Sequence, residues 1–127
     1  MEDNMKKVLL AAVLISALFL SSCSRTQVGW VATNLGNTFE ASYRRFDGQE
    51  VETYQLESGK SFSLSYDIEV NEGSLTLELV NPEDEPVWEE SFSENAEDVF
   101  EFTPETTGRY RLRVIGDDTR GSFELTW

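Results

Sequence analysis

The side chains that most often carry out chemistry in proteins are scarce in this sequence. Its 127 residues include no histidine and a single cysteine, Cys23. Without histidine, a serine or threonine nucleophile lacks its commonest activating base, and a zinc ion lacks its commonest ligand. One cysteine excludes an intramolecular disulfide and any multi-cysteine metal site. We therefore expect a protein that is not an enzyme and that uses no cofactor.

Acidic residues are abundant instead, with 24 acidic and 10 basic side chains and a net charge of −14. This balance argues against binding to nucleic acid, which needs a basic surface. Calcium takes roughly six to eight oxygen ligands, and Asp117 and Asp118 are the best candidate pair for it. No ligand spacing of the EF-hand type is present. We therefore favour the alternative that these acids are solubilising turn residues and that no metal is bound.

Three arginines at alternate positions could form an anion site. Arg109, Arg111 and Arg113 would share one face of a strand, where guanidinium groups can bind the carboxylates of a partner. The alternative, which we favour, is that they pair across the sheet with glutamates such as Glu78 and Glu101.

Aromatic side chains could instead stack on sugar rings, with Trp88 and Tyr54 as the candidates. Trp88 follows Val87, and consecutive residues of a strand point to opposite faces, so one of the two faces solvent unless a bulge intervenes. We expect the exposed residue to be Trp88. Trp127 is in phase with Phe123 and Leu125 and is expected in the core.

The elements that must position these residues are β-strands. Apolar and polar residues alternate strictly in four segments and less regularly in five more, which is typical of antiparallel sheets with one buried face. Turn residues separate the segments, among them Asp47-Gly48, Asn71-Glu72-Gly73 and Asp117 through Gly121. We predict an all-β fold, an antiparallel, jelly-roll-like β-sandwich of about eight strands. The segments are 28–33, 38–46, 51–56, 62–70, 75–79, 87–92, 99–103, 110–114 and 123–127.

The N-terminus has the pattern of a signal peptide. Lys6 and Lys7 precede an apolar run from Val8 to Leu20 that only Ser16 interrupts. As a helix the run would measure about 20 Å, against about 30 Å of membrane hydrocarbon, so it is too short to span. A basic segment followed by an apolar core of this length indicates secretion.

The end of this segment resembles the lipobox of bacterial lipoproteins. Leu20, Ser21, Ser22 and Cys23 form an aliphatic residue, two small residues and a cysteine. The resemblance implies that residues 1–22 are removed and that the thiol of Cys23 is diacylated. Two acyl chains suffice for stable anchoring. Membrane attachment through Cys23 is thus predicted, on the outer membrane or on the outer face of the plasma membrane.

Removal of residues 1–22 leaves the net charge at −14, so the charge belongs to the exported part. We expect a tether at residues 23–27 and one β-sandwich domain at 28–127. Since the tether is short, the domain should lie close to the bilayer. Anionic headgroups should repel an acidic domain there, which argues against recognition of the lipid surface itself.

Residues 51–127 resemble the bacterial pre-peptidase C-terminal domains and the related GOLD and CUB-like jelly rolls. The resemblance rests on the segments GSLTLELVNPEDEPVW (73–88), FEFTPETTGRYRLRV (100–114) and GSFELTW (121–127). Asn81-Pro82 and Gly108-Arg109-Tyr110 are the nearest matches. The acidic residues that some members associate with calcium are replaced by Gly73-Ser74-Leu75-Thr76, so calcium is not carried over. The resemblance implies a non-catalytic binding or assembly module, with an unknown protein or glycan as partner. A glycan-binding surface module and an accessory subunit of an envelope complex are the alternatives.

Overall fold

The structure is a computed structural model that describes residues 25–127. The predicted signal peptide, the predicted lipobox and Cys23 lie outside the described residues. Within residues 25–127 no helix is long and apolar enough to cross a membrane. The strands are β1 (Thr26–Val28), β2 (Val31–Leu35), β3 (Thr38–Leu56), β4 (Phe62–Val80), β5 (Pro86–Phe92), β6 (Ala96–Phe102) and β7 (Gly108–Thr126).

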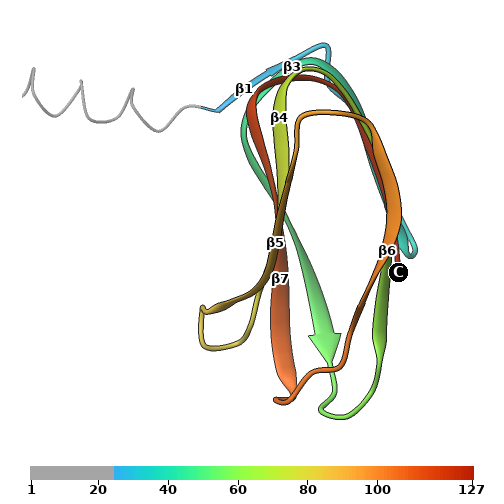
Figure 1. Cartoon of the computed structure of the whole chain (residues 1–127), viewed down its shortest axis with the longest axis vertical. Coiled ribbons are helices and arrows are strands. Elements are labelled where there is room, and N and C mark those ends of the chain that lie inside the picture. The colour runs from blue at the N-terminus through green and yellow to red at the C-terminus, as the bar shows by residue number, and fades with distance from the viewer. Residues whose placement is uncertain (1–24) are drawn as a thin grey trace, which may run out of the picture.

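Three long strands organise the fold. β3, β4 and β7 have 19 residues each, and each bends near its middle, so that it arches over the top of the molecule (Figure 1). The bends coincide with shifts of pairing register between Tyr43 and Gly48 and between Val70 and Ser74. Irregularities of this kind re-aim a strand without ending it. One seven-stranded antiparallel sheet is thereby folded over onto itself.

The fold-over produces the two layers of a β-sandwich. The first layer contains β2, β6 and residues 38–46, 119–126 and 62–70 of the long strands. The second layer contains β5 and residues 48–56, 108–116 and 74–80. β1 pairs with residues 45–47 at the bends. We call the region formed by residues 25–31, 44–50, 71–74 and 115–121 the bend end.

Alternate residues of the long strands fill the space between the layers. Aromatic contacts join the two layers directly: Tyr66 packs on Phe92 with ring centroids 5.3 Å apart, and Phe102 packs on Tyr110 at 5.8 Å. The core has a Leu-rich part in the second layer and an aromatic part near the bend end. Completely buried side chains include Phe46, Ile68, Leu75, Leu77, Leu112, Val114 and Leu125.

The predicted sandwich is confirmed, but three of the expected turns are wrong. Asp47-Gly48, Asn71-Glu72-Gly73 and Asp117 through Gly121 lie inside continuous strands, at the bends. Each long strand therefore joins two of the predicted segments, which reduces the nine segments to six, and the division of the first segment into β1 and β2 makes seven strands in place of about eight. The first predicted strand, 28–33, is also corrected, because Gly29 and Trp30 separate β1 from β2.

The two motifs that resemble the pre-peptidase domains lie against each other. A Cβ atom placed on Gly108 would come within 2.7 Å of the Pro82 side chain, so only glycine permits this approach without a shift. The hydroxyl of Tyr110 donates a 2.7 Å hydrogen bond to the carbonyl of Thr106, which ties the preceding loop to the start of β7. The motif residues thus fix the end of the sandwich opposite the bends.

Candidate functional site

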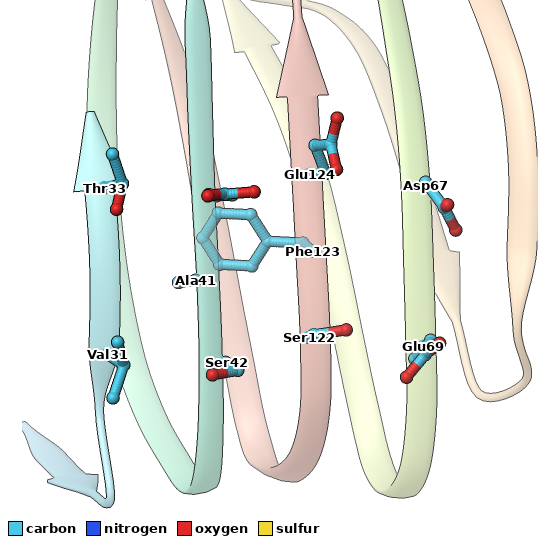
Figure 2. Close-up of a pocket in the computed structure, with 10 residues that line it drawn as sticks. Val31, Thr33, Ala41, Ser42, Asp67, Glu69, Ser122, Phe123 and Glu124 are labelled. Atoms are coloured by element: carbon cyan, nitrogen blue, oxygen red, sulfur yellow. The ribbon is translucent and has the colours of Figure 1, made fainter. Parts of the chain in front are cut away.

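The outer face of the first layer carries an open hollow of about 370 Å³ (Figure 2). Its ten lining residues include four carboxylates and no lysine or arginine; they are Val31, Thr33, Glu40, Ala41, Ser42, Asp67, Glu69, Ser122, Phe123 and Glu124. The rest of the polar lining consists of hydroxyl groups. We call the outward-facing residues Glu40, Asp67, Glu69, Glu97 and Glu124 the acidic face.

Strand register places four of these acids in a single row. Glu40 lies opposite Glu124, Glu124 lies opposite Asp67, and Asp67 lies opposite Glu97. Like charges directly opposite each other in a sheet are destabilising. The row therefore lowers the stability of the fold. The sequence alone does not reveal it, because the register of four strands creates it.

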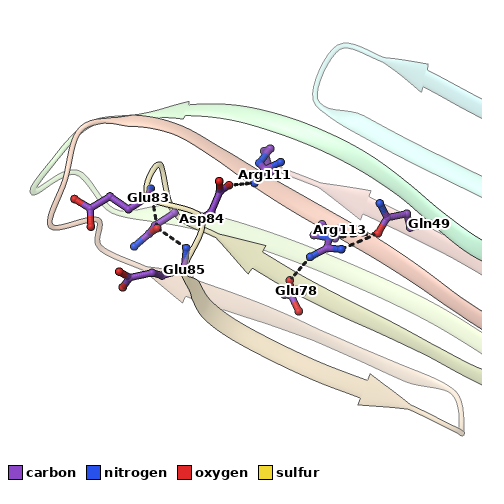
Figure 3. Close-up of polar contacts among 8 residues, drawn as sticks. Gln49, Glu78, Glu83, Asp84, Glu85, Arg111 and Arg113 are labelled. Atoms are coloured by element: carbon purple, nitrogen blue, oxygen red, sulfur yellow. Dashed lines mark hydrogen bonds and ion pairs between the residues drawn. The ribbon is translucent and has the colours of Figure 1, made fainter.

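The outer face of the second layer carries the arginines, and their side chains are largely paired (Figure 3). Arg113 binds Glu78 at 3.0 Å and also donates to the amide oxygen of Gln49 at 3.0 Å. Arg111 pairs with Asp84. The expected pairing with Glu78 is confirmed, whereas that with Glu101 is wrong, since Glu101 lies opposite Ser63 in the other layer. Arg109 is exposed and makes no ion pair within residues 25–127.

A well-formed turn presents Asp84 to Arg111. The side-chain oxygen of Asn81 accepts hydrogen bonds from the backbone N–H groups of Glu83 and Glu85, both at 2.9 Å (Figure 3). An asparagine that bonds its own backbone in this way holds a turn in place. Arg113 thus stabilises the sheet and Arg111 stabilises the turn. The structure does not bring the three arginines together as an open anion site.

The expectation that Trp88 faces outward is wrong. Trp88 lies opposite Leu79, on the inner side of the second layer, and Val87 is the exposed neighbour at 39%. The Trp88 ring stacks on Phe100 of the other layer, with centroids 4.0 Å apart and planes at 8°. Trp88 therefore closes one side of the core, and it is not free to stack on a sugar from the outer surface.

Tyr54 is also an inner residue, and it lies far from Trp88 in the sheet order. It is 5% exposed and packs against Phe62 and Trp127, with both centroid distances at 5.0 Å. Its hydroxyl is buried without a hydrogen-bond partner among the described residues. These three aromatics line an uncharged hollow of about 470 Å³ together with Thr53, Gln55, Leu56, Ser61 and Ser63.

The candidate calcium pair lies at the bend end. The Asp118 carboxylate accepts a 2.6 Å bond from Arg45, and its backbone N–H donates to Asp47. In the described part of the chain no group of three or more acidic residues is arranged to hold a metal ion. Asp118 therefore takes part in the polar contacts that hold the bends together, and Asp117 lies beside it in β7, opposite Ser74.

The buried tyrosines set an alkaline limit to stability. Burial, helped by the charges of Glu90 and Asp98, raises the pKa of Tyr66 to about 12. Burial also raises the pKa values of Tyr43 and Tyr54 well above the usual range. In the unfolded chain these phenols ionise near pH 10. The folded state consequently keeps protons that the unfolded state loses, and stability must fall as the pH rises above 10.

We expect Tyr66→Phe to weaken this pH dependence. The variant should reduce the loss of stability between pH 10 and 12 by up to about 1.4 kcal/mol per pH unit, which is the contribution of one proton. Urea unfolding at pH 8, 10 and 11 measures it. An unchanged slope in the variant would show that Tyr66 ionises equally easily in both states.

Neither a protein-family model nor a curated protein matches this sequence. Among solved structures, the chain is similar to a carbohydrate-binding module of family 4, with 10% identity, coverage of 78% of this chain and 75% of that one, and a TM-score of 0.49. It is also similar to the pre-peptidase C-terminal domain of collagenase from Bacillus anthracis, with 22% identity, coverage of 72% and 88%, and a TM-score of 0.49. A family 29 carbohydrate-binding module gives 15% identity, coverage of 81% and 71%, and a TM-score of 0.40. A pre-peptidase C-terminal domain, the class that residues 51–127 resemble in sequence, is thus among the similar structures. The β-sandwich itself is defined by the strand pairing described above.

Proposed function

We propose that the protein is an exported lipoprotein, anchored through Cys23, that acts as a non-catalytic binding or assembly module in the cell envelope. The acidic face is its contact surface for a partner with basic side chains. The observation that supports this assignment is the row Glu40–Glu124–Asp67–Glu97, in which acids lie directly opposite one another on adjacent strands. A basic partner would neutralise this repulsion on binding and would gain affinity and association rate from it.

Neutralising the row of acids tests the proposed contact surface, because it should raise the stability of the domain and lower its binding to partners. In the variant Glu40→Gln/Asp67→Asn/Glu124→Gln we expect higher stability, by about 0.5 kcal/mol for each opposed pair relieved. We also expect partner recovery to fall at least tenfold when the lipidated protein is affinity-purified from envelopes. Urea unfolding and quantitative mass spectrometry measure the two effects.

The matched control is Glu83→Gln/Glu94→Gln/Glu105→Gln. It removes the same number of charges from exposed positions in the connections between strands. It should change neither quantity appreciably, because surface substitutions of this kind stay within about 0.5 kcal/mol. Equal recovery of partners with both triple variants would contradict the assignment of the acidic face.

One observation favours glycan binding as the second candidate. The hollow at Tyr54, Phe62 and Trp127 is uncharged in a strongly acidic domain, and it offers aromatic, amide and hydroxyl groups beside the unpartnered Tyr54 hydroxyl. Such groups recognise neutral sugars. Binding on a glycan array that is lost in Gln55→Ala and retained in the acidic-face variant would favour this candidate over the first.

A further inference from the structure

The bend end is the part of the domain nearest to the proposed lipid anchor. Only Ser24 and Arg25 separate Cys23 from Thr26, where β1 begins. Three extended residues span at most about 11 Å. β1 is paired with residues 45–47 at the bends, so it cannot move away from them while the sheet is intact. An acylated Cys23 would therefore hold the bend end at the membrane surface.

The charge of the domain is distributed unevenly about this end. The bend end holds four of the eight basic side chains of residues 25–127 but only five of the 22 acidic ones. Arg25 pairs with Glu50 at 2.9 Å and Arg45 with Asp118 at 2.6 Å. Arg44 and Arg120 are exposed and make no ion pair within the described residues, so both can reach a phosphate. The excess acidic charge lies beyond the bends, toward the opposite end of the molecule.

The same end presents uncharged and apolar surface. Residues 26–39 contain no charged side chain over 14 positions. Within this stretch Val28 is 47% exposed and Val31 is 69% exposed. Trp30 lies between them, half-buried, and stacks on Tyr43 with centroids 5.6 Å apart. Partly exposed tryptophan beside arginine is typical of residues at a membrane–water interface.

We propose that the bend end docks on the phospholipid surface, with Val28, Trp30 and Val31 at headgroup level and with Arg44 and Arg120 against the phosphates. This docking rests on the proposed acylation of Cys23. The bends lie at one end of the long axis of the sandwich (Figure 1), so docking there directs this axis away from the membrane. Val31 lies at the bend-side edge of the hollow, and the row Glu40–Glu124–Asp67–Glu97 lies two residues farther from the bends, where it stays open to partners. The repulsion expected from the total charge is thus reduced, because the bend end has a net charge of −1 and the rest of residues 25–127 has a net charge of −13.

Lipid-borne quenchers test the orientation on the lipidated protein. A fluorescent label is attached at Val31→Cys or, as the matched control, at Ser58→Cys in the connection between β3 and β4 at the opposite end. The protein is bound to vesicles of phosphatidylethanolamine and phosphatidylglycerol that carry a headgroup-depth nitroxide. We expect at least threefold stronger quenching at position 31 than at position 58.

Flotation of the same vesicles separates this inference from the anchor. Protein that floats with equal quenching at both positions would overturn the docking and leave the anchor in place. Protein that does not float would overturn both. The quenching at position 31 should not depend on the number of proteins per vesicle. A dependence on that number would identify a contact between copies and would also overturn the docking.

Charge reversal tests the role of the two arginines. Arg44→Glu/Arg120→Glu should at least halve the quenching at position 31 at low salt, while Lys60→Glu/Arg109→Glu, an equal change of charge elsewhere, should leave it unchanged. Equal effects of the two variants would overturn the assignment of Arg44 and Arg120 to phosphate contacts.

Discussion

Gly121→Ala is expected to destabilise the domain by about 3 kcal/mol or more, a large fraction of the about 5–15 kcal/mol by which native domains are stable. Gly121 lies at the bend of β7, opposite Tyr43 on one side and Val70 on the other. Its φ of +154° is in a region that is almost exclusive to glycine. A Cβ atom there would lie 1.9 Å from the backbone carbonyl oxygen of Glu69. Because that atom belongs to the main chain of β4, the sheet itself would have to separate at the bend.

The control for this effect is Gly36→Ala, in the turn between β2 and β3. Gly36 has a φ of +60°, and a Cβ atom added to it would meet nothing within 4 Å. The control therefore measures the cost of a left-handed backbone alone, about 1–2 kcal/mol. The difference between the losses of stability of the two variants, measured by urea unfolding, gives the contribution of the close approach of β7 to β4. Equal losses of stability would mean that the bend does not depend on this contact.

Cys23→Ser is expected to abolish stable membrane association. The variant removes the thiol that would carry two acyl chains, each contributing about 0.8 kcal/mol for every CH₂ buried in the bilayer. The docking surface at the bend end is too small to replace them, so the protein should move to the soluble fraction. Fractionation of cells that express the variant measures this, with the neighbouring substitution Ser24→Ala as the control. Membrane retention of Cys23→Ser equal to that of the control would contradict the anchor.

The alternation of apolar and polar residues was sufficient to predict the strands and the two-layered fold. Phe62 to Val70 and Leu75 to Leu79 both keep the period of two, and the structure buries the apolar set of each. What the pattern did not predict is that the two segments are one strand. Asn71-Glu72-Gly73 has the composition of a turn, and only pairing with β7 on both sides of it shows that the chain bends there and continues.

Side-chain direction in the irregular strands was less predictable. In β5, Val87 and Trp88 are followed by Glu89 and Glu90, so the local pattern favours neither face. Pairing of Trp88 with Leu79 decides it, because Leu79 belongs to the Leu-rich inner row. The acidic face was unpredictable for the same reason, because it is created by the pairing of strands that are distant in sequence. Glu40 and Glu124 are 84 positions apart in sequence and directly opposite in the sheet.

Total charge was also a poor guide to the surface that we propose faces the membrane. The value of −14 describes the whole chain, whereas the folded-over sheet gathers Arg25, Arg44, Arg45 and Arg120 at one end. These arginines come from three segments that are distant in sequence. The bends that bring them together were not predicted, so the gathering could not be predicted either.

The most direct test of an anchored module is the mass of its N-terminal peptide, isolated from membranes of cells that produce the full chain. We expect a peptide that begins at Cys23 and carries the added mass of a diacylglyceryl group on its sulfur. A peptide that retains residues before Cys23, or one that contains an unmodified Cys23, would contradict it.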